Sequence, residues 1–260
     1  MQKKSAWNRL LEILSGSGQV GAAHPTEPAT ATLQKPQPAP GDPDSKPEPH
    51  VRSPEKLHPG LTCQSINIIR GDLQTFPENI TARRIKVRSQ NLRQVGAGLC
   101  CNSLDFTGTQ IEELPDDLSV RDRLCLGSCR QLRRLPDDLT TGSLVLSECT
   151  ALAELPKGLD VTFLDLSGCT SLRTLPDDMK IRGGSLSLRG CPWITKLPVN
   201  LGAISELDLS GCLNLSRVPE GLEVTSWIDL AGTSIRELPP NMRDVGLRWN
   251  GMPVNYQIVF

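Results

Sequence analysis

Cysteine is the residue type in this sequence whose spacing most suggests chemistry. Five of the nine cysteines recur at steps of 20 to 22 residues: Cys129, Cys149, Cys169, Cys191 and Cys212. A zinc site needs thiolates that converge from two short loops, whereas a regular interval sets the sulfurs in one column about 5 Å apart. We expect buried, reduced thiols, each a small apolar group with a weak S–H donor to the loop backbone. Thr109 and Thr233 occupy the equivalent place in neighbouring repeats.

Histidine is placed unfavourably for catalysis. His24, His50 and His58 all lie within the first 60 residues, so we expect no imidazole in the folded part for a Ser/His pair, a Cys/His pair or a metal ion. The sequence has no G-x-S-x-G, P-loop or H-E-x-x-H motif, and Gly183-Gly184 is expected in a lengthened repeat turn. We therefore predict no catalytic, cofactor-binding or metal-binding residues and no enzymatic activity.

Paired aspartates are a second candidate for acid–base chemistry or metal binding. The pairs recur at one position of a repeat, immediately after a proline: Asp116/Asp117, Asp137/Asp138 and Asp177/Asp178. Recurrence at a turn position favours turn capping and solubility over a catalytic dyad.

Composition divides the chain into two parts. Ten of the 21 prolines fall in residues 1–60, which contain too few Ile, Val and Phe to bury a core. We predict a disordered leader over 1–60, with a short amphipathic helix at 1–15 as a further expectation, and a packed domain over 61–260. Arg9 and Glu12 interrupt the apolar run near the start, which argues against a Sec signal peptide. The leader suits either a solvated linker or a recognition segment for a secretion chaperone.

Net charge and hydropathy exclude two classes of partner. The formal charge is −1 and the pI is near 6.3, so non-specific binding to nucleic acid is not expected. No stretch approaches 18 uninterrupted apolar residues, so we predict no membrane span.

An internal repeat organises residues 61–260. Dipeptides such as Leu155-Pro156 and Leu175-Pro176 recur at steps of 19 to 22 residues, and an apolar pair such as Leu164 and Leu166 follows each one. Each pair predicts a short strand with inward side chains. The unit over 155–172 reads LPKGLDVTFLDLSGCTSL, which resembles the leucine-rich-repeat pattern.

The repeat length predicts the architecture, because a unit of about 20 residues must stack on its neighbours to bury its leucines. We predict an α/β-type solenoid: a leucine-rich-repeat horseshoe of about nine repeats, with short parallel strands on the concave face. The return path is too short for a full helix, so the convex face should be largely irregular.

The concave face is the candidate partner-binding surface, since strand side chains that alternate with the inward pair point away from the core. Its early repeats are basic, whereas residues from Leu135 onward comprise 10 basic and 15 acidic residues. The candidate partner-binding residues are Arg84, Lys86, Arg123, Phe163, Asp165, Glu206, Asp208, Trp227, Asp229 and Arg248. Phe163 and Trp227 are either anchors for a partner or covers for neighbouring strands.

The L-P-x-x-L…L-x-L-S-x-C units and the Pro-rich leader resemble the leucine-rich-repeat effectors that bacterial pathogens, especially plant pathogens, send into host cells by type III secretion. The resemblance covers residues 61 to about 252. It implies a virulence-associated module that reaches the host cytoplasm by a non-Sec route and binds a host protein through its concave face. Relatives of the ubiquitin-ligase kind add a C-terminal catalytic domain, and we expect no such domain after the last repeat.

Two alternatives remain open at the level of sequence. One is the substrate-recognition half of a ubiquitin ligase whose catalytic domain is absent or separately encoded. The other is a cytoplasmic scaffold that is never secreted.

Overall fold

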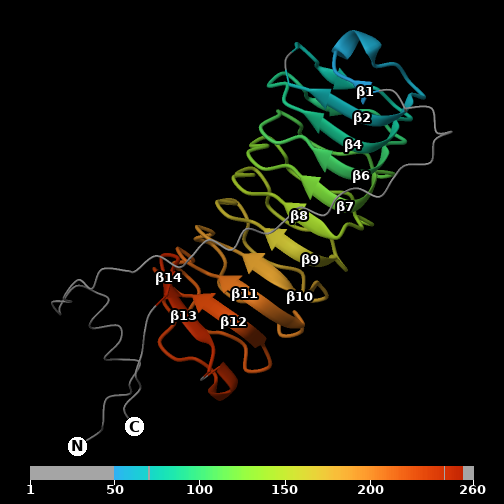
Figure 1. Ribbon diagram of the computed structural model, residues 1–260. Helices are drawn as coiled ribbons and strands as arrows, with labels where there is room; N and C mark the ends of the chain where they lie inside the picture. The colour runs from blue at the N-terminus through green and yellow to red at the C-terminus, as the bar shows by residue number, and fades with distance from the viewer. Residues whose placement is uncertain (1–49, 70, 243, 254–260) are drawn as a thin grey trace, which may run out of the picture. The chain divides into compact units, whose positions relative to one another are not determined.

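The computed structural model describes residues 50–69, 71–242 and 244–253. Its main feature is one 12-stranded sheet in which each strand lies beside the next along the chain (Figure 1). In sheet order, its strands are β1 (His50–Val51), β2 (Thr62–Ile68), β4 (Thr81–Val87), β6 (Cys100–Asp105), β7 (Ser119–Cys125), β8 (Ser143–Val145), β9 (Asp160–Asp165), β10 (Lys180–Ser187), β11 (Ala203–Asp208), β12 (Glu223–Asp229), β13 (Gly246–Trp249) and β14 (Met252–Pro253). Neighbouring strands are parallel except for the final pair, β13 and β14.

Irregular segments, which we call the return loops, connect one strand of the sheet to the next. They contain a second, two-stranded parallel ladder of β3 (Thr75–Phe76) and β5 (Gln94–Val95). The helical structure of the described residues consists of two 3-10 turns, η2 (Pro54–Lys56) and η3 (Pro240–Met242). The predicted parallel-stranded solenoid with irregular return loops is therefore confirmed, while the described part has no helical layer that would place it in an α/β class. None of its helices is long and apolar enough to cross a membrane.

The described solenoid begins earlier in the chain than the composition indicates. Strand β1 pairs with β2 through His50 and Ser65, and η2 follows, so part of the segment 1–60 belongs to the repeat structure. The rest of the predicted leader and the helix expected at 1–15 lie outside the described residues.

The core follows from the repeat pattern. In β9, Val161 and Leu164 are buried while Thr162 and Phe163 between them are exposed. The register places Leu164 between Leu144 and Leu186 of the adjacent strands. Strands β2 to β12 of the sheet thus each supply an equivalent leucine or isoleucine to one continuous apolar core, which confirms the predicted register.

A turn with left-handed backbone precedes each cysteine of the column. Gly168 and Gly190 adopt φ angles of 73° and 68°, and Glu148 adopts 60° at the equivalent place. The N–H of Glu148 donates to the carbonyl of Ser167 at 2.6 Å, and that of Gly168 donates to Arg189 at 2.7 Å. The turn thereby links successive repeats, and it favours glycine because a side chain in this region costs free energy.

The glycine pair at 183–184 lies inside β10 instead of in the lengthened turn that we predicted. The pairing of β10 with β9 shifts register between Ile181 and Ser185. A Cβ atom on Gly184 would overlap the carbonyl oxygen of Thr162, so glycine allows the two backbones to approach at this bulge.

Candidate partner-binding face

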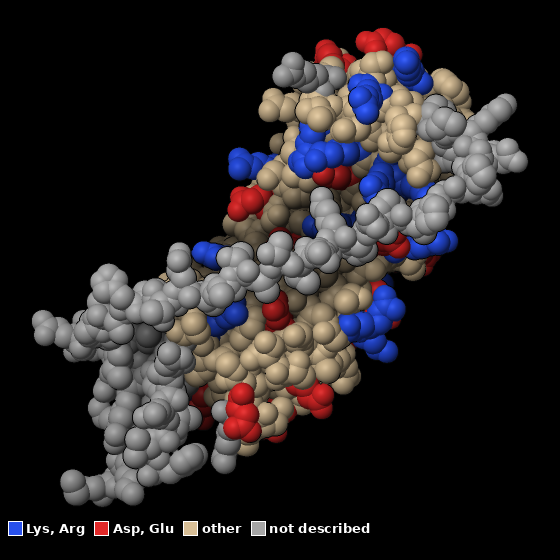
Figure 2. All heavy atoms as spheres, viewed as in Figure 1, with Lys and Arg blue, Asp and Glu red and all other residues tan. Residues whose placement is uncertain are grey.

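Strand residues that point away from the core form two columns on the outer surface of the 12-stranded sheet, which we call the sheet face. The first column contains Ser65, Arg84, Ser103, Arg123, Ser143, Phe163, Ser185, Glu206 and Trp227. The second contains Lys86, Asp105, Cys125, Val145, Asp165, Ser187, Asp208, Asp229 and Arg248. All of the sequence-predicted partner-binding residues lie in these columns. Figure 2 shows basic side chains gathered over the end of the molecule formed by the first strands.

Phe163 is the most accessible large apolar side chain in either column, with 37% of its surface exposed. Its neighbours in the first column are Ser143 on β8 and Ser185 on β10. Because both neighbours are small, the ring stands above its surroundings and is available to a partner.

Trp227 is less available than we predicted. The guanidinium of Arg248 lies over its ring, 4.0 Å from the centroid, and the side chain is only partly exposed. Its Nε1–H is buried and has no hydrogen-bond partner among the described residues. Trp227 therefore packs against the last strand through a cation–π contact, and this contact brings two of the predicted residues together.

The acidic side chains Asp165 and Asp208 are used within their own loops. Oδ1 of Asp165 accepts from the N–H of Ser167 at 2.9 Å and from its hydroxyl at 2.6 Å. Asp208 accepts the same two bonds from Ser210. These Asx-type turns fix the chain as it leaves each strand. The recurring Asp-x-Ser/Thr spacing is the sequence signal for them, and our sequence analysis did not use it.

Asp229 has no exposed surface, which differs from its predicted place on a binding surface. Its Oδ1 accepts from the N–H groups of Ala231 at 3.0 Å and Asn250 at 3.2 Å, and its Oδ2 accepts from the N–H of Gly251. The carboxylate therefore anchors the turn between β13 and β14 and leaves no atom for a partner to contact.

The cysteine column forms as predicted. Its five thiols are completely buried, and each donates to a carbonyl oxygen of the preceding repeat at 3.1 to 3.2 Å. Burial raises the pKa of the Cys149 and Cys212 thiols to about 12 and that of Cys191 to about 11. Thr109 contacts Cys129 at 3.3 Å, and the Thr233 hydroxyl donates to Leu230. Protonated, buried thiols act as packing groups and weak donors.

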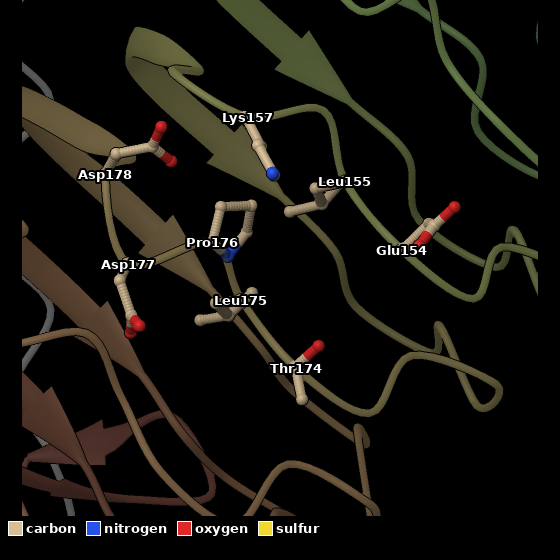
Figure 3. Close-up of a pocket in the computed structure, with 8 residues that line it drawn as sticks. All are labelled: Glu154, Leu155, Lys157, Thr174, Leu175, Pro176, Asp177 and Asp178. Carbon is tan, nitrogen blue, oxygen red and sulfur yellow. The ribbon is translucent and has the colours of Figure 1, made fainter.

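Shallow grooves on the return loops contain the paired aspartates. Asp137 and Asp138 line one groove, and Asp177 and Asp178 line the next, which Figure 3 shows. The two grooves share Glu154, Leu155 and Lys157 as a wall.

The first aspartate pair bonds to the neighbouring repeats and not to its own turn, which differs from the turn capping that we predicted. Asp117 accepts a bond from the backbone N–H of Gly98 at 2.8 Å, and Asp116 contacts Arg134 at 3.3 Å. The side chains of the later pairs make no hydrogen bond to other described residues. Three return loops thus carry an aspartate pair, whereas the loop after Pro156 carries Lys157 and Gly158 at the equivalent positions.

A serine–histidine contact exists where we expected none. Nδ1 of His50 lies 2.7 Å from Oγ of Ser65, because β1 belongs to the repeat structure. A nucleophilic serine needs a base that a third group orients. Within the described ranges no other side chain forms a hydrogen bond or an ion pair with the His50 ring. The contact is a cross-strand hydrogen bond at the first rung of the sheet.

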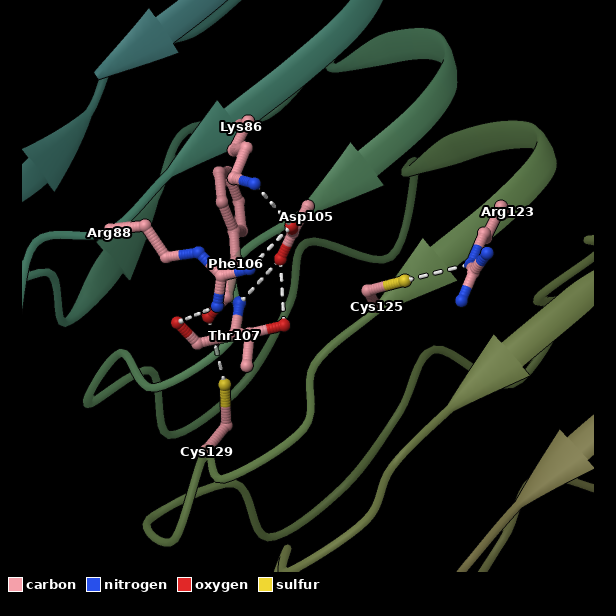
Figure 4. A network of polar contacts seen from close by, with 8 residues as sticks. All are labelled: Lys86, Arg88, Asp105, Phe106, Thr107, Arg123, Cys125 and Cys129. Carbon is pink, nitrogen blue, oxygen red and sulfur yellow. Dashed lines mark hydrogen bonds and ion pairs between the residues drawn. The ribbon is translucent and has the colours of Figure 1, made fainter. Parts of the chain in front are cut away.

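The basic end of the sheet face centres on Asp105 (Figure 4). Its Oδ2 accepts from Arg88 at 2.8 Å and lies 3.8 Å from the Lys86 ammonium. Its Oδ1 accepts from the N–H and hydroxyl of Thr107. On the next strand, Nε of Arg123 donates to the Cys125 sulfur at 3.1 Å. Asp105 therefore pairs with both Lys86 and Arg88 but not with Arg123.

No cluster of three or more metal-ligating side chains occurs among the residues that the structure describes. No family model matches the chain, and neither a curated protein nor a solved structure matches it.

Proposed function

We propose that this chain is a protein-interaction module whose sheet face binds a partner protein. The observation that carries the proposal is Phe163, a residue that is 37% exposed between two serines on adjacent strands. Rigid aromatic side chains that enter a pocket on the partner dominate the binding energy of many interfaces.

The contrast between core and sheet face supports the same function. The inward position of successive strands is occupied by Leu144, Leu164 and Leu186. The outward position beside it varies among Ser143, Phe163 and Ser185. Stacked repeats in which a constant core presents a varied surface provide extended binding faces.

Binding is favoured over catalysis by the state of the reactive side chains. The thiols of the cysteine column are buried and their pKa values are raised. The imidazole of His50 contacts Ser65 without a third described group to orient it. Neither arrangement supplies an activated nucleophile.

We further propose that the solenoid is a leucine-rich-repeat horseshoe with a concave sheet face and that the chain is a type III secreted effector acting in the host cytoplasm. The unit over 155–172 and the proline content of the first 60 residues support this assignment. A translocation reporter fused to residues 1–60 should enter host cells only when the secretion system is intact. Export that does not depend on that system would contradict the effector assignment.

Site-specific crosslinking tests the proposed binding face. A photo-crosslinking amino acid at position 163 should capture a protein from host extract, whereas the same group at position 137, on a return loop, should not. Capture from position 137 but not from position 163 would place the binding face on the return loops.

A further inference from the structure

Two arginines of the first column have no acidic partner among the residues that the structure describes. Arg84 forms no hydrogen bond or ion pair with another described residue. Arg123 uses only its Nε, which donates to Cys125, so both of its Nη groups lack a partner within the described part of the chain (Figure 4). The register places Ser103 between the two arginines.

The carboxylates of the sheet face are already engaged elsewhere. Asp105 pairs with Lys86 and Arg88. Glu206 is the first carboxylate of the column that contains the two arginines, and it lies four strands beyond Arg123. Its side chain accepts a hydrogen bond from the Ser185 hydroxyl at 3.0 Å. Neither Arg84 nor Arg123 is therefore paired with a carboxylate among the described residues, although the exposed Asp122 follows Arg121 on the same strand as Arg123.

The spacing of the two arginines suits a compact anion. Their strands are two positions apart in the sheet, which sets their Cα atoms about 10 Å from each other. Two long side chains that start at this separation can converge above the Ser103 hydroxyl. A guanidinium offers a planar fork of donors that matches phosphate oxygens.

We propose that Arg84, Ser103 and Arg123 bind the phosphate group of a phosphorylated segment of the partner protein. The inference rests on the proposed function, because it specifies the chemistry of a partner on the same face. A phosphomonoester carries about −1.5 to −2 charges near neutral pH and three acceptor oxygens. It can thus neutralise both guanidinium groups, whereas a single carboxylate cannot.

Phe163 adds a second contact for the same segment. It lies two strands beyond Arg123 in the first column, again about 10 Å away. An extended chain advances about 3.3 to 3.6 Å per residue. An apolar side chain about three residues from the phosphorylated residue would therefore reach the ring.

Fluorescence anisotropy with the full chain tests the phosphate site. The probes are labelled glycine-rich peptides that carry one phosphoserine and a leucine about three residues to either side of it. We expect one of them to bind, inorganic phosphate to compete, and the versions with serine or glutamate to bind at least about tenfold more weakly. Arg84→Gln and Arg123→Gln should each weaken phosphopeptide binding about tenfold.

Arg130→Gln is the matched control, because it removes the same charge from an exposed position after β7 and outside both columns. It should leave phosphopeptide binding unchanged, and circular dichroism should show the native fold in all three variants. An equal loss with Arg130→Gln, or equal affinity for the glutamate peptide, would overturn the phosphate site.

The partner captured through position 163 separates this inference from the proposed function. If Phe163→Ala abolishes its capture while the two arginine variants bind it normally, the phosphate site is wrong and the binding face stands. If phosphopeptide binding depends on the arginines while Phe163→Ala captures the partner normally, the phosphate site stands and the role proposed for Phe163 fails.

Discussion

The thiol of Cys169 donates a hydrogen bond to the carbonyl oxygen of Leu146, 3.2 Å away in the preceding repeat. Equivalent bonds join Cys149 to Leu126 and Cys191 to Leu166. A small, completely buried side chain thus fills the core and satisfies a loop carbonyl at the same time.

This relationship predicts an order of stability losses. Leu166→Ala leaves a cavity in the core and should lower the free energy of unfolding by about 2–5 kcal/mol. Cys169→Ala removes one polarisable atom and a weak bond, so it should cost less. Urea denaturation compares the two variants. A larger loss for Cys169→Ala than for Leu166→Ala would mean that our repeat register assigns the inward and loop positions wrongly.

Alkaline pH should destabilise the solenoid through the same column. Desolvation by burial raises the pKa of the Cys212 thiol from 9.0 to about 12. As the pH rises, the unfolded chain loses this proton before the folded chain does. The contribution of the protonated Cys212 thiol to the free energy of unfolding is therefore complete below about pH 9 and is lost as the pH rises toward about 12. Urea denaturation under reducing conditions should show a shallower alkaline decline for Cys212→Ala than for the native chain. Identical pH dependence of the two proteins would rule out this contribution.

The left-handed turns predict opposite effects at equivalent positions. Glu148→Gly should raise the free energy of unfolding by about 1 kcal/mol, because glycine adopts a φ of 60° without steric cost. Gly190→Ala should lower it by a similar amount. A Cβ atom at Gly190 would lie 3.9 Å from the nearest backbone atom, so the loss would report φ strain without a clash. Thermal denaturation measures both changes, and a destabilised Glu148→Gly variant would contradict the account of this turn.

The buried carboxylate predicts a contrast between two aspartates. In Asp229→Asn, the side-chain amide would direct its own N–H groups at the Gly251 N–H or at the two N–H groups that now donate to Oδ1. Because donors would then face donors, the free energy of unfolding should fall by about 1–3 kcal/mol. Both bonds to Asp208 go to Oδ1, so the side-chain oxygen of Asp208→Asn can still accept them. This substitution should leave the free energy of unfolding nearly unchanged. Limited proteolysis near residues 246–253 should accelerate only in Asp229→Asn. Equal cleavage in both variants would show that the carboxylate does not anchor the turn.

The repeat register could be predicted from the sequence because every unit repeats the same burial requirement. Leu164, Leu166 and Cys169 recur in equivalent form, so the inward positions and the cysteine column follow from one alignment. The two outward columns then follow from strand alternation, which assigns the candidate residues to outward positions of their strands.

The availability of those residues could not be predicted from alternation alone. Asp165 is turned to its own loop by Ser167, and Asp229 is buried by a closing hairpin that has no counterpart in the repeat pattern. Arg248 reaches Trp227 only because β13 continues the sheet beyond β12. His50 was assigned to the leader because the prolines around it dominate the local composition, although its backbone pairs with β2.

The affinity of the captured partner for the Phe163→Ala variant tests the binding face most directly. Removal of the exposed ring leaves the inward Leu164 in place, so the fold should survive while the binding free energy falls by at least about 2 kcal/mol. The matched control replaces Asp137 and Asp138 on the return loops by serine and should bind the partner as the native chain does. A normal affinity for Phe163→Ala together with a weakened affinity for the return-loop variant would contradict the assignment of the sheet face.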